Sequence, residues 1–381
     1  MKRSFIFLFT LLILAIFTFS SEKYVVPGSK VKEGEAFIPY QTEEGPESNI
    51  YIYDGKDLFI KVYSPDGEFL FRMGGRGEGP GEFKRDGRFG FTYDGKKIFA
   101  TEYFQGHNWI TFFSLKGKFI KTLKLPFKGF YGVVKAIDMG KDIFILRVTY
   151  SGKVFKKGKI YYYGNRDVIY SFNVKSREYF EIKKSYNDTR ISNISSGGDI
   201  GIPFIPKFNW GVMQNRSILF SDGLSNTFVL LGLDGKKISS IKIPIPSPEK
   251  ITSKDLDRWR KRIKEYFVTS DPGWYKTFGN VAEKYKDSIY KYKPCHNGFR
   301  ITPDGNILVD VTKDEEKKML DYYLFDSSGK LIAKICVRNK TVKISKHYII
   351  VDYTDEDDEE EIRVYKRSGK EEKDLKRISG C

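Results

Sequence analysis

A structural unit that recurs along the chain is the feature that most constrains the fold. Each copy has an apolar strand, a break, a second strand rich in aromatic residues, a turn that usually ends in glycine, and a third strand. The clearest copy is Leu58–Met73, LFIKVYSPDGEFLFRM, which turns at Asp66-Gly67. The other copies are Ile98–Leu125, Ile143–Ile182, Ile218–Ile243, Ile307–Cys336 and Tyr348–Tyr365, with turns at 116–117, 175–176, 234–235, 328–329 and 368–369. Six copies of one unit predict a repeat architecture.

Asp-Gly pairs supply a second turn in several units. This pair favours a hairpin between apolar runs because glycine accepts a positive φ. Seven pairs occur, at 54–55, 66–67, 86–87, 94–95, 222–223, 234–235 and 304–305. Asp94-Gly95 and Asp304-Gly305 stand just before a strand and fit the turn between the first and second strands of a unit. Two hairpin turns give four strands, and four-stranded units arranged radially make a β-propeller. The sequence therefore predicts an all-β, six-bladed β-propeller with antiparallel blades.

Two parts of the chain depart from the simple repeat. The first blade shows only three clear strands, and its first strand could come from Ala36–Gln41, or the C-terminal strand could complete it. The longest gap, about 248–290, contains Ser253–Phe267, whose apolar residues recur at helical spacing and whose Ser253 is a candidate N-cap. We expect a small helical insertion there, between blades four and five, with a second short helix around Val281–Asp287.

The N-terminal residues have the pattern of an export signal. Lys2 and Arg3 precede a 15-residue apolar run, Phe5–Phe19, which is shorter than the ~20 residues of a membrane-spanning helix. Small residues precede a cut after Ser20, as in secretory signal peptides. We expect residues 1–20 to be a signal peptide and residues 21–381 a secreted or periplasmic propeller that is not an integral membrane protein. An uncleaved anchor is the alternative.

The charge and the cysteines leave alternatives open. The formal net charge is +17, but Lys and Arg are spread along the chain, with no compact basic helix or aromatic-spaced motif. We expect no nucleic-acid partner; the charge fits either a generally cationic surface or an anionic envelope partner. Cys295 and Cys336 could form a disulfide in an oxidising compartment, or both could be buried free thiols. The third cysteine is Cys381, the last residue.

The segment Gly74–Phe83, GGRGEGPGEF, carries a family resemblance. It follows the strand 68–73 and precedes the Asp94-Gly95 turn, and over residues 58–102 the chain resembles bacterial six-bladed β-propellers related to NHL-repeat propellers. The resemblance implies that the segment links adjacent blades. A dinucleotide-binding reading is disfavoured because Pro80 interrupts the segment and strands follow it, where a helix is required.

Few residues point to catalysis. The sequence has three histidines, His107, His296 and His347, in different blades, whereas a zinc site needs three or four ligands in one place. Some propellers of the resembling group are zinc-dependent lyases, and other six-bladed propellers are hydrolases with a central calcium. Calcium takes Asp, Asn and Glu oxygens, which are abundant here, so calcium is the one cofactor that the sequence leaves open. The acidic run Asp355–Glu361 lacks the spacing of a calcium-binding loop, and we interpret it as a solvated hairpin loop.

Loops on a rigid scaffold usually carry function, and in a propeller the blade-to-blade connections share one face with the loops between second and third strands. This places nine candidate binding residues near one mouth: Arg76, Glu78, Arg85, His107, Trp109, Tyr131, Trp210, His296 and Arg300. We expect a monomeric binding module that engages a glycan, a peptide or an envelope protein through this face. The alternative is a calcium- or zinc-dependent hydrolase or lyase with its site at the central channel.

Overall fold

The computed structural model describes residues 23–26, 39–103, 108–157, 160–192, 199–201, 208–270, 292–314, 319–338, 340–354 and 360–378. The first three blades hold β2 (Pro39–Glu44), β3 (Ile50–Asp54), β4 (Phe59–Tyr63) and β5 (Phe69–Gly74); β6 (Gly87–Phe91), β7 (Lys97–Glu102), β8 (Trp109–Ser114) and β9 (Phe119–Lys124); and β10 (Phe130–Asp138), β11 (Ile143–Lys157), β12 (Ile160–Asn173), β13 (Tyr179–Ser192) and β14 (Asp199–Gly201). The last three hold β15 (Asn209–Val212), β16 (Ile218–Ser221), β17 (Thr227–Leu231) and β18 (Lys237–Lys242); β19 (Gly298–Ile301), β20 (Ile307–Asp314), β21 (Met319–Phe325) and β22 (Leu331–Arg338); and β23 (Lys340–Ile344), β24 (Tyr348–Thr354), β25 (Glu360–Lys366) and β1 (Lys23–Val26).

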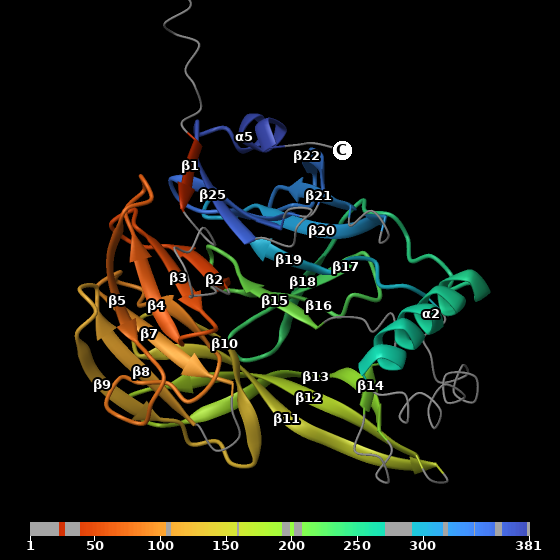
Figure 1. Cartoon of the computed structure of the whole chain (residues 1–381), viewed down its shortest axis with the longest axis horizontal. Helices are drawn as coiled ribbons and strands as arrows, with labels where there is room; N and C mark the ends of the chain where they lie inside the picture. The colour runs from red at the N-terminus through yellow and green to blue at the C-terminus, as the bar shows by residue number, and fades with distance from the viewer. Residues whose placement is uncertain are drawn as a thin grey trace, which may run out of the picture.

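The predicted six-bladed propeller is confirmed. Six antiparallel sheets follow one another around a ring, and the first strand of each blade lies toward the axis (Figure 1). Five sheets have four strands, and the third has a fifth, β14. We call the side with the blade-to-blade connections and the loops between second and third strands the loop face. The opposite side, with the turns between first and second and between third and fourth strands, is the turn face.

The ring closes through the N-terminal strand. β1 pairs antiparallel with β25, Lys23 opposite Tyr365, and becomes the outermost strand of the sixth blade. The first blade takes its own first strand, β2, from the region of Ala36–Gln41, so completion of that blade by the C-terminal strand is wrong. The turn at Ser368-Gly369 is also not followed by a strand. It leads into helix α5 (Glu371–Ile378), whose Leu375 and Ile378 are buried against the fifth and sixth blades.

The predicted turns match the structure where the sequence signal is strongest. Asp94-Gly95 and Asp304-Gly305 lie between first and second strands, with glycine φ of 67° and 83°. In each turn the glycine N–H donates to a threonine carbonyl three residues back, and only glycine adopts this φ at low cost. The segment Gly74–Phe83 connects β5 to β6, as the resemblance implied, and buries Phe83 between the first two blades.

The hydrophobic core runs around the ring. Six clusters of buried side chains each fill the space between two neighbouring blades. Among the described side chains, the cluster between the second and third blades has thirteen buried members and that between the sixth and first has six. Every blade therefore contributes to two cores, and among the described side chains the closing junction has the fewest buried apolar members.

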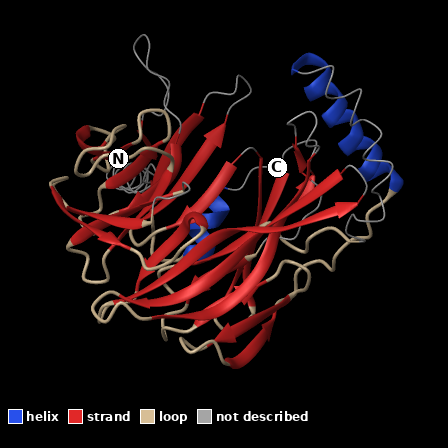
Figure 2. Cartoon of the chain, turned by 90° about the horizontal axis from the view of Figure 1, so that it is seen from below, coloured by secondary structure: helices blue, strands red, loops and turns tan. Residues whose placement is uncertain are grey.

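The predicted helical insertion lies between β18 and β19. Helix α2 (Ser253–Ser270) stands beside the ring of strands (Figure 2). Its N-cap is Thr252, not Ser253: the Thr252 hydroxyl accepts the Asp255 N–H (3.3 Å), and the Asp255 carboxylate accepts the Thr252 N–H (2.9 Å). The second predicted helix, Val281–Asp287, lies outside the described residues. No described helix is long and apolar enough to cross a bilayer.

Candidate functional site

Polar side chains join the six blades around the axis. At every junction a side chain on one blade donates a hydrogen bond to a backbone carbonyl on the next blade in chain order. The bonds are Gln41 Nε2 to Phe89 O (2.8 Å), Thr101 Oγ1 to Val133 O (3.4 Å), Lys135 Nζ to Trp210 O (2.9 Å), Asn209 Nδ2 to Asn297 O (3.4 Å), Arg300 Nη1 to Val342 O (2.8 Å) and Lys343 Nζ to Thr42 O (3.0 Å). We call this set the carbonyl ring.

Three of these six donors are cations, and their charges gather at the axis. Lys135, Arg300 and Lys343 belong to the first strands β10, β19 and β23, and Arg147 lies on β11 directly opposite Lys135. Glu43 on β2 forms an ion pair with Lys343. These five residues are the axial cluster. Like charges directly opposite each other destabilise a strand pair, so Lys135 facing Arg147 is a cost that the apolar packing of the blades must offset.

Two cations of the axial cluster lack a counter-charge. Arg147 is neutralised by Asp167 (2.5 Å), and Lys343 by Glu43. Among the residues that the structure describes, no carboxylate lies within ion-pair distance of Lys135 or Arg300. Arg300 is exposed although it lies on a first strand, and side chains of the other members are partly exposed. The axis is therefore a partly exposed, cationic site.

Lys135 shows the electrostatic cost most clearly. Its pKa is lowered to about 8, chiefly by burial and also by the charges of Arg147, Arg300 and Lys343, while Glu43 acts to raise it. Its ammonium lies 4.7 Å from the centroid of the Trp210 ring, a cation–π contact. A β-bulge between Val133 and Lys135 sets the direction of this side chain. A bound anion would raise the pKa of Lys135 and so bind together with a proton at alkaline pH.

A nearby carboxyl does not supply the missing charge. Asp352 on β24 is half-buried with its Oδ1 shielded from solvent, and burial raises its pKa above the usual range, while Arg300 and Lys343 act to lower it. A carboxyl with a raised pKa is less effective as a counter-ion. The axial cluster therefore keeps a net positive charge near neutral pH.

Exposed tyrosines lie where the first strands begin at the loop face. Tyr40 on β2 and Tyr131 on β10 occupy equivalent β-bulges and are 40% and 41% exposed. Arg88 on β6 is exposed, and its charge acts on Tyr40. Burial and the neighbouring Asp86 carboxylate raise the pKa of Tyr40, so its hydroxyl stays protonated and can donate a hydrogen bond. Bulges often re-aim side chains beside functional sites. We call Tyr40, Arg88 and Tyr131 the mouth residues.

The structure places three predicted residues at this site. Arg300 is a member of the axial cluster, Trp210 is the aromatic surface beneath Lys135, and Tyr131 is a mouth residue. The Trp210 side chain itself is 2% exposed, and within the described structure its indole Nε1 has no hydrogen-bond partner. Their contact with a ligand stays a prediction.

Four others lie in or beside the connections at the loop face. Glu102 brings Arg85 and Trp109 together: its carboxylate accepts the Arg85 N–H (3.1 Å) and the Trp109 indole N–H (3.2 Å). Arg76 donates to the Lys56 carbonyl (3.0 Å), and Glu78 pairs with Lys84 (2.5 Å). These contacts hold the Gly-rich connection in shape, and ligand contacts by these four residues stay predictions.

The two candidate histidines differ. His296 is 1% exposed, its Nε2 lies 2.8 Å from Ser221 Oγ, and its ring packs beside the contacting rings of Phe228 and Phe299. Burial lowers its pKa to about 4, so it is neutral at physiological pH. The structure gives it a place in the interior, and a ligand contact stays a prediction. His107 lies outside the described residues.

The proposed Cys295–Cys336 disulfide is wrong. Cys295 is a buried free thiol, whereas Cys336 is disulfide-bonded. Cys295 precedes β19, the first strand of the fifth blade, and Cys336 lies on β22, the fourth. Strands are spaced about 4.8 Å apart, so the two sheet edges are separated by about 14 Å, while disulfide Cα atoms lie within about 7 Å.

The sequence offered few clues to Lys135, Lys343, Arg147 and Glu43. Arg147 is an ordinary charged residue within a predicted copy of the repeat, and the other three lie outside the predicted copies. Their importance comes from the meeting of different blades at the axis. The available signal was a lysine in the mostly apolar run of β10, FYGVVKAID. Among the described residues, no group of three His, Cys, Asp or Glu side chains could hold a metal ion.

Neither a known protein-family profile nor a curated protein sequence matches the chain. Solved structures do match. A member of the DUF4221 family from Bacteroides vulgatus is 7% identical, with a TM-score of 0.52, over 91% of this chain and 96% of that one. Virginiamycin B lyase from Staphylococcus aureus is 9% identical, with a TM-score of 0.43, over 90% and 99%. Regucalcin, a calcium-binding protein from Agrobacterium tumefaciens, is 11% identical, with a TM-score of 0.43, over 88% and 94%. At this identity the DUF4221 likeness shows the fold alone, and the two weaker ones carry no functional argument.

Proposed function

We propose that this propeller is an exported binding module for an acidic glycan of the cell envelope. The observation that carries the proposal is the axial cluster, where Lys135 and Arg300 lack a counter-charge among the described residues. A carboxylate or sulfate group on a sugar would supply it through charge-assisted hydrogen bonds.

Two further observations support a glycan as the ligand. The exposed rings of Tyr40 and Tyr131 lie at the loop face, where they can pack against the apolar face of a sugar while their hydroxyl groups stay hydrated. The net charge of +17 attracts acidic polymers over distances longer than a contact. No specific observation favours the metal-dependent hydrolase or lyase over binding.

The binding experiment compares polymers that share a backbone and differ in charge. Isothermal titration calorimetry with polygalacturonate and dextran sulfate is compared with methyl-esterified polygalacturonate and unmodified dextran. We expect at least one acidic polymer to bind and its neutral counterpart not to. Arg300→Gln should weaken binding about tenfold, because it removes a charge while leaving an amide that can still donate toward the Val342 carbonyl.

The matched control is Arg72→Gln. Arg72 lies on β5, the outermost strand of the first blade, where its guanidinium packs on Phe59 (4.2 Å). The substitution removes the same charge far from the axis and should leave affinity unchanged. Equal binding of acidic and neutral polymers, or equal losses in both variants, would contradict the axial site.

Export is part of the proposal. Its support is the basic start and apolar run of residues 1–20 and the disulfide at Cys336, a bond that persists in oxidising compartments. Mass spectrometry of the protein from its native host should find Ser21 as the mature N-terminus; intact Met1 would favour an anchor. The relationship to NHL-repeat propellers, suggested by Gly74–Phe83, also remains a proposal.

A further inference from the structure

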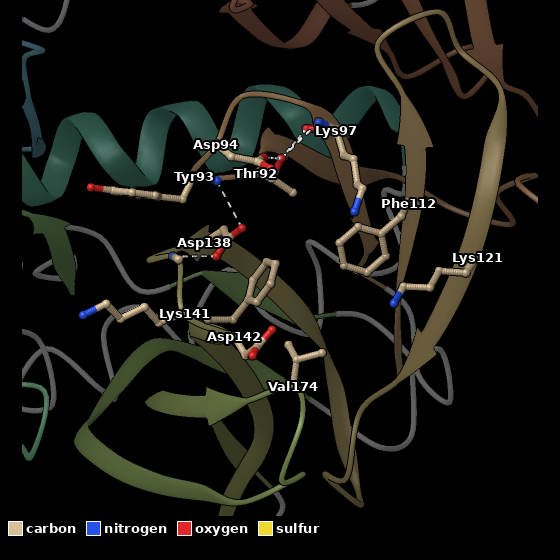
Figure 3. Close-up of a pocket in the computed structure, with 12 residues that line it drawn as sticks. Thr92, Tyr93, Asp94, Lys97, Phe112, Lys121, Asp138, Lys141, Asp142 and Val174 are labelled. Atoms are coloured by element: carbon tan, nitrogen blue, oxygen red, sulfur yellow. Dashed lines mark hydrogen bonds between the residues drawn. The ribbon is translucent and has the colours of Figure 1, made fainter.

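A cavity of about 330 Å³ lies between the second and third blades on the turn face, opposite the mouth residues. The β6–β7 and β10–β11 turns form two of its sides, and strands β8 and β9 contribute side chains from a third (Figure 3). Its volume falls within the range of small-molecule sites, about 300–1,000 Å³. The axial cluster contributes none of the lining residues.

The base of the cavity is apolar. Phe112 and Phe144 are buried, and their rings meet edge to face, with centroids 6.2 Å apart. Val174 adds a partly buried aliphatic group. An aromatic ring of a ligand would find two ring surfaces and an aliphatic contact here, an arrangement that stabilises aromatic packing.

The rim carries two cations on one side. Lys97 and Lys121 extend toward Phe112 (Figure 3), and the Lys121 ammonium lies 5.6 Å from the Phe112 centroid. Within the described part of the chain, neither ammonium has a carboxylate within ion-pair distance. They are placed to receive the carboxylate of a ligand whose ring lies on Phe112.

The opposite side presents one unused carboxylate. Asp138 accepts the backbone N–H groups of Tyr93 (3.1 Å) and Gly140 (2.8 Å), so its oxygens are occupied. The Asp142 side chain has no hydrogen-bond or ion-pair partner among the described residues. Asp142 can therefore receive an ammonium group.

The backbone that presents Asp142 is strained. Gly140, Lys141 and Asp142 have consecutive positive φ values of 69°, 51° and 62°. The turn is held by hydrogen bonds from Ile143 N to Gly140 O (3.2 Å) and from Val174 N to Asp142 O (2.7 Å). Non-glycine residues in this conformation cluster at ligand sites, where the surroundings maintain them.

We propose that this cavity, which we call the side pocket, binds a small aromatic zwitterion such as a free aromatic amino acid. The ring lies on Phe112 and Phe144, the carboxylate faces Lys97 and Lys121, and the ammonium faces Asp142. This ligand matches Lys97, Lys121 and Asp142, while Lys141, which also lines the cavity, extends away from the apolar base (Figure 3). An aromatic acid or amine alone leaves one side unmatched.

Three indole compounds test the charge pattern: L-tryptophan, indole-3-propionate, which lacks the ammonium, and tryptamine, which lacks the carboxylate. Ligand-observed NMR titration should show tryptophan binding about threefold to fivefold more tightly than either analogue, as expected for one partly exposed ion pair. Equal affinities for all three, or no saturable binding at millimolar ligand, would overturn the proposal.

Variants assign each charge. Asp142→Asn keeps a residue that tolerates positive φ; it should weaken tryptophan binding to the level of indole-3-propionate and leave indole-3-propionate unchanged. Lys121→Gln should weaken both carboxylates and leave tryptamine unchanged. Lys116→Gln, on the exposed β8–β9 turn outside the pocket, is the control. Loss of indole-3-propionate binding in Asp142→Asn would refute the assignment. Arg300→Gln should not affect tryptophan, which separates this site from the axial cluster.

Discussion

Lys135 should make the propeller less stable at neutral pH than at alkaline pH, and the size of the effect follows from its pKa. An ordinary lysine pKa is 10.5, and burial lowers that of Lys135 to about 8. The unfolded chain therefore binds more protons between pH 8 and 10.5, and the free energy of unfolding rises through this window. At about 1.4 kcal/mol per pKa unit, the lowered pKa of Lys135 reduces the free energy of unfolding by about 3 kcal/mol at pH 7 and by about half of that at pH 9.5.

The assay compares wild type with Lys135→Met in urea denaturation at pH 7 and pH 9.5. The substitution also removes the hydrogen bond to the Trp210 carbonyl and the contact with its ring, but those losses largely cancel when the same pair of proteins is compared at two pH values. The variant should lose up to about 2 kcal/mol relative to wild type on going from pH 7 to 9.5; water at the axis screens the charge and reduces this figure.

Lys116→Met removes a lysine from an exposed turn and is the matched control, with no expected pH-dependent difference from wild type. If Lys135→Met and wild type differ by the same free energy of unfolding at both pH values, the pKa of Lys135 is not lowered in the folded state. The electrostatic basis of the proposed glycan site would then fail.

Three other predictions follow from the same structure. Binding of the acidic glycan should weaken about tenfold between pH 6.5 and 9, as Lys135 loses its proton, in calorimetry at constant ionic strength. Gly235→Ala should lower the melting temperature more than Gly369→Ala. Both glycines have positive φ, but a Cβ at Gly235 would lie 2.8 Å from the Ile182 carbonyl oxygen, whereas a Cβ at Gly369 would meet open space. Equal shifts in melting temperature would show that φ strain alone determines the effect. Thr252→Ala should cost about 1 kcal/mol through loss of the helix cap and speed amide exchange in the first turn of α2 relative to the blades; unchanged exchange there would contradict the cap assignment.

The sequence predicts the fold well because turns and strands are local. An Asp-Gly pair between apolar runs specifies a hairpin from a few residues, as at Asp94-Gly95 and Asp304-Gly305. The sequence did not reveal the closing strand β1. Its four residues, KYVV, are not joined to β25 by a local turn, because β25 lies more than 300 positions later in the chain.

The site was harder to predict than the fold. Blade topology alone grouped Trp210 and Arg300 with the loop-face residues; the structure puts both on first strands, and their contacts with a ligand stay predictions. Three features distinguish Lys135 from an exposed lysine: the two β-bulges in β10, the lack of a nearby carboxylate among the described residues, and the cations on other blades. None of these can be read from the local sequence. The side pocket lies on the turn face, where the sequence shows only tight turns, and no sequence motif distinguishes its lining residues.

The pairing of β1 with β25 sets an order of events for a newly made chain. Until both ends of the chain are available, the sixth blade has an open edge at β25, and unpaired edges recruit strands from other molecules. Completion of the ring therefore depends on a contact that forms last in synthesis, and such distant contacts form slowly. If export removes residues 1–20, the freed end begins only two residues before β1. The peptidase would then have to act before β1 pairs with β25. Removal of the signal peptide would therefore precede closure of the ring.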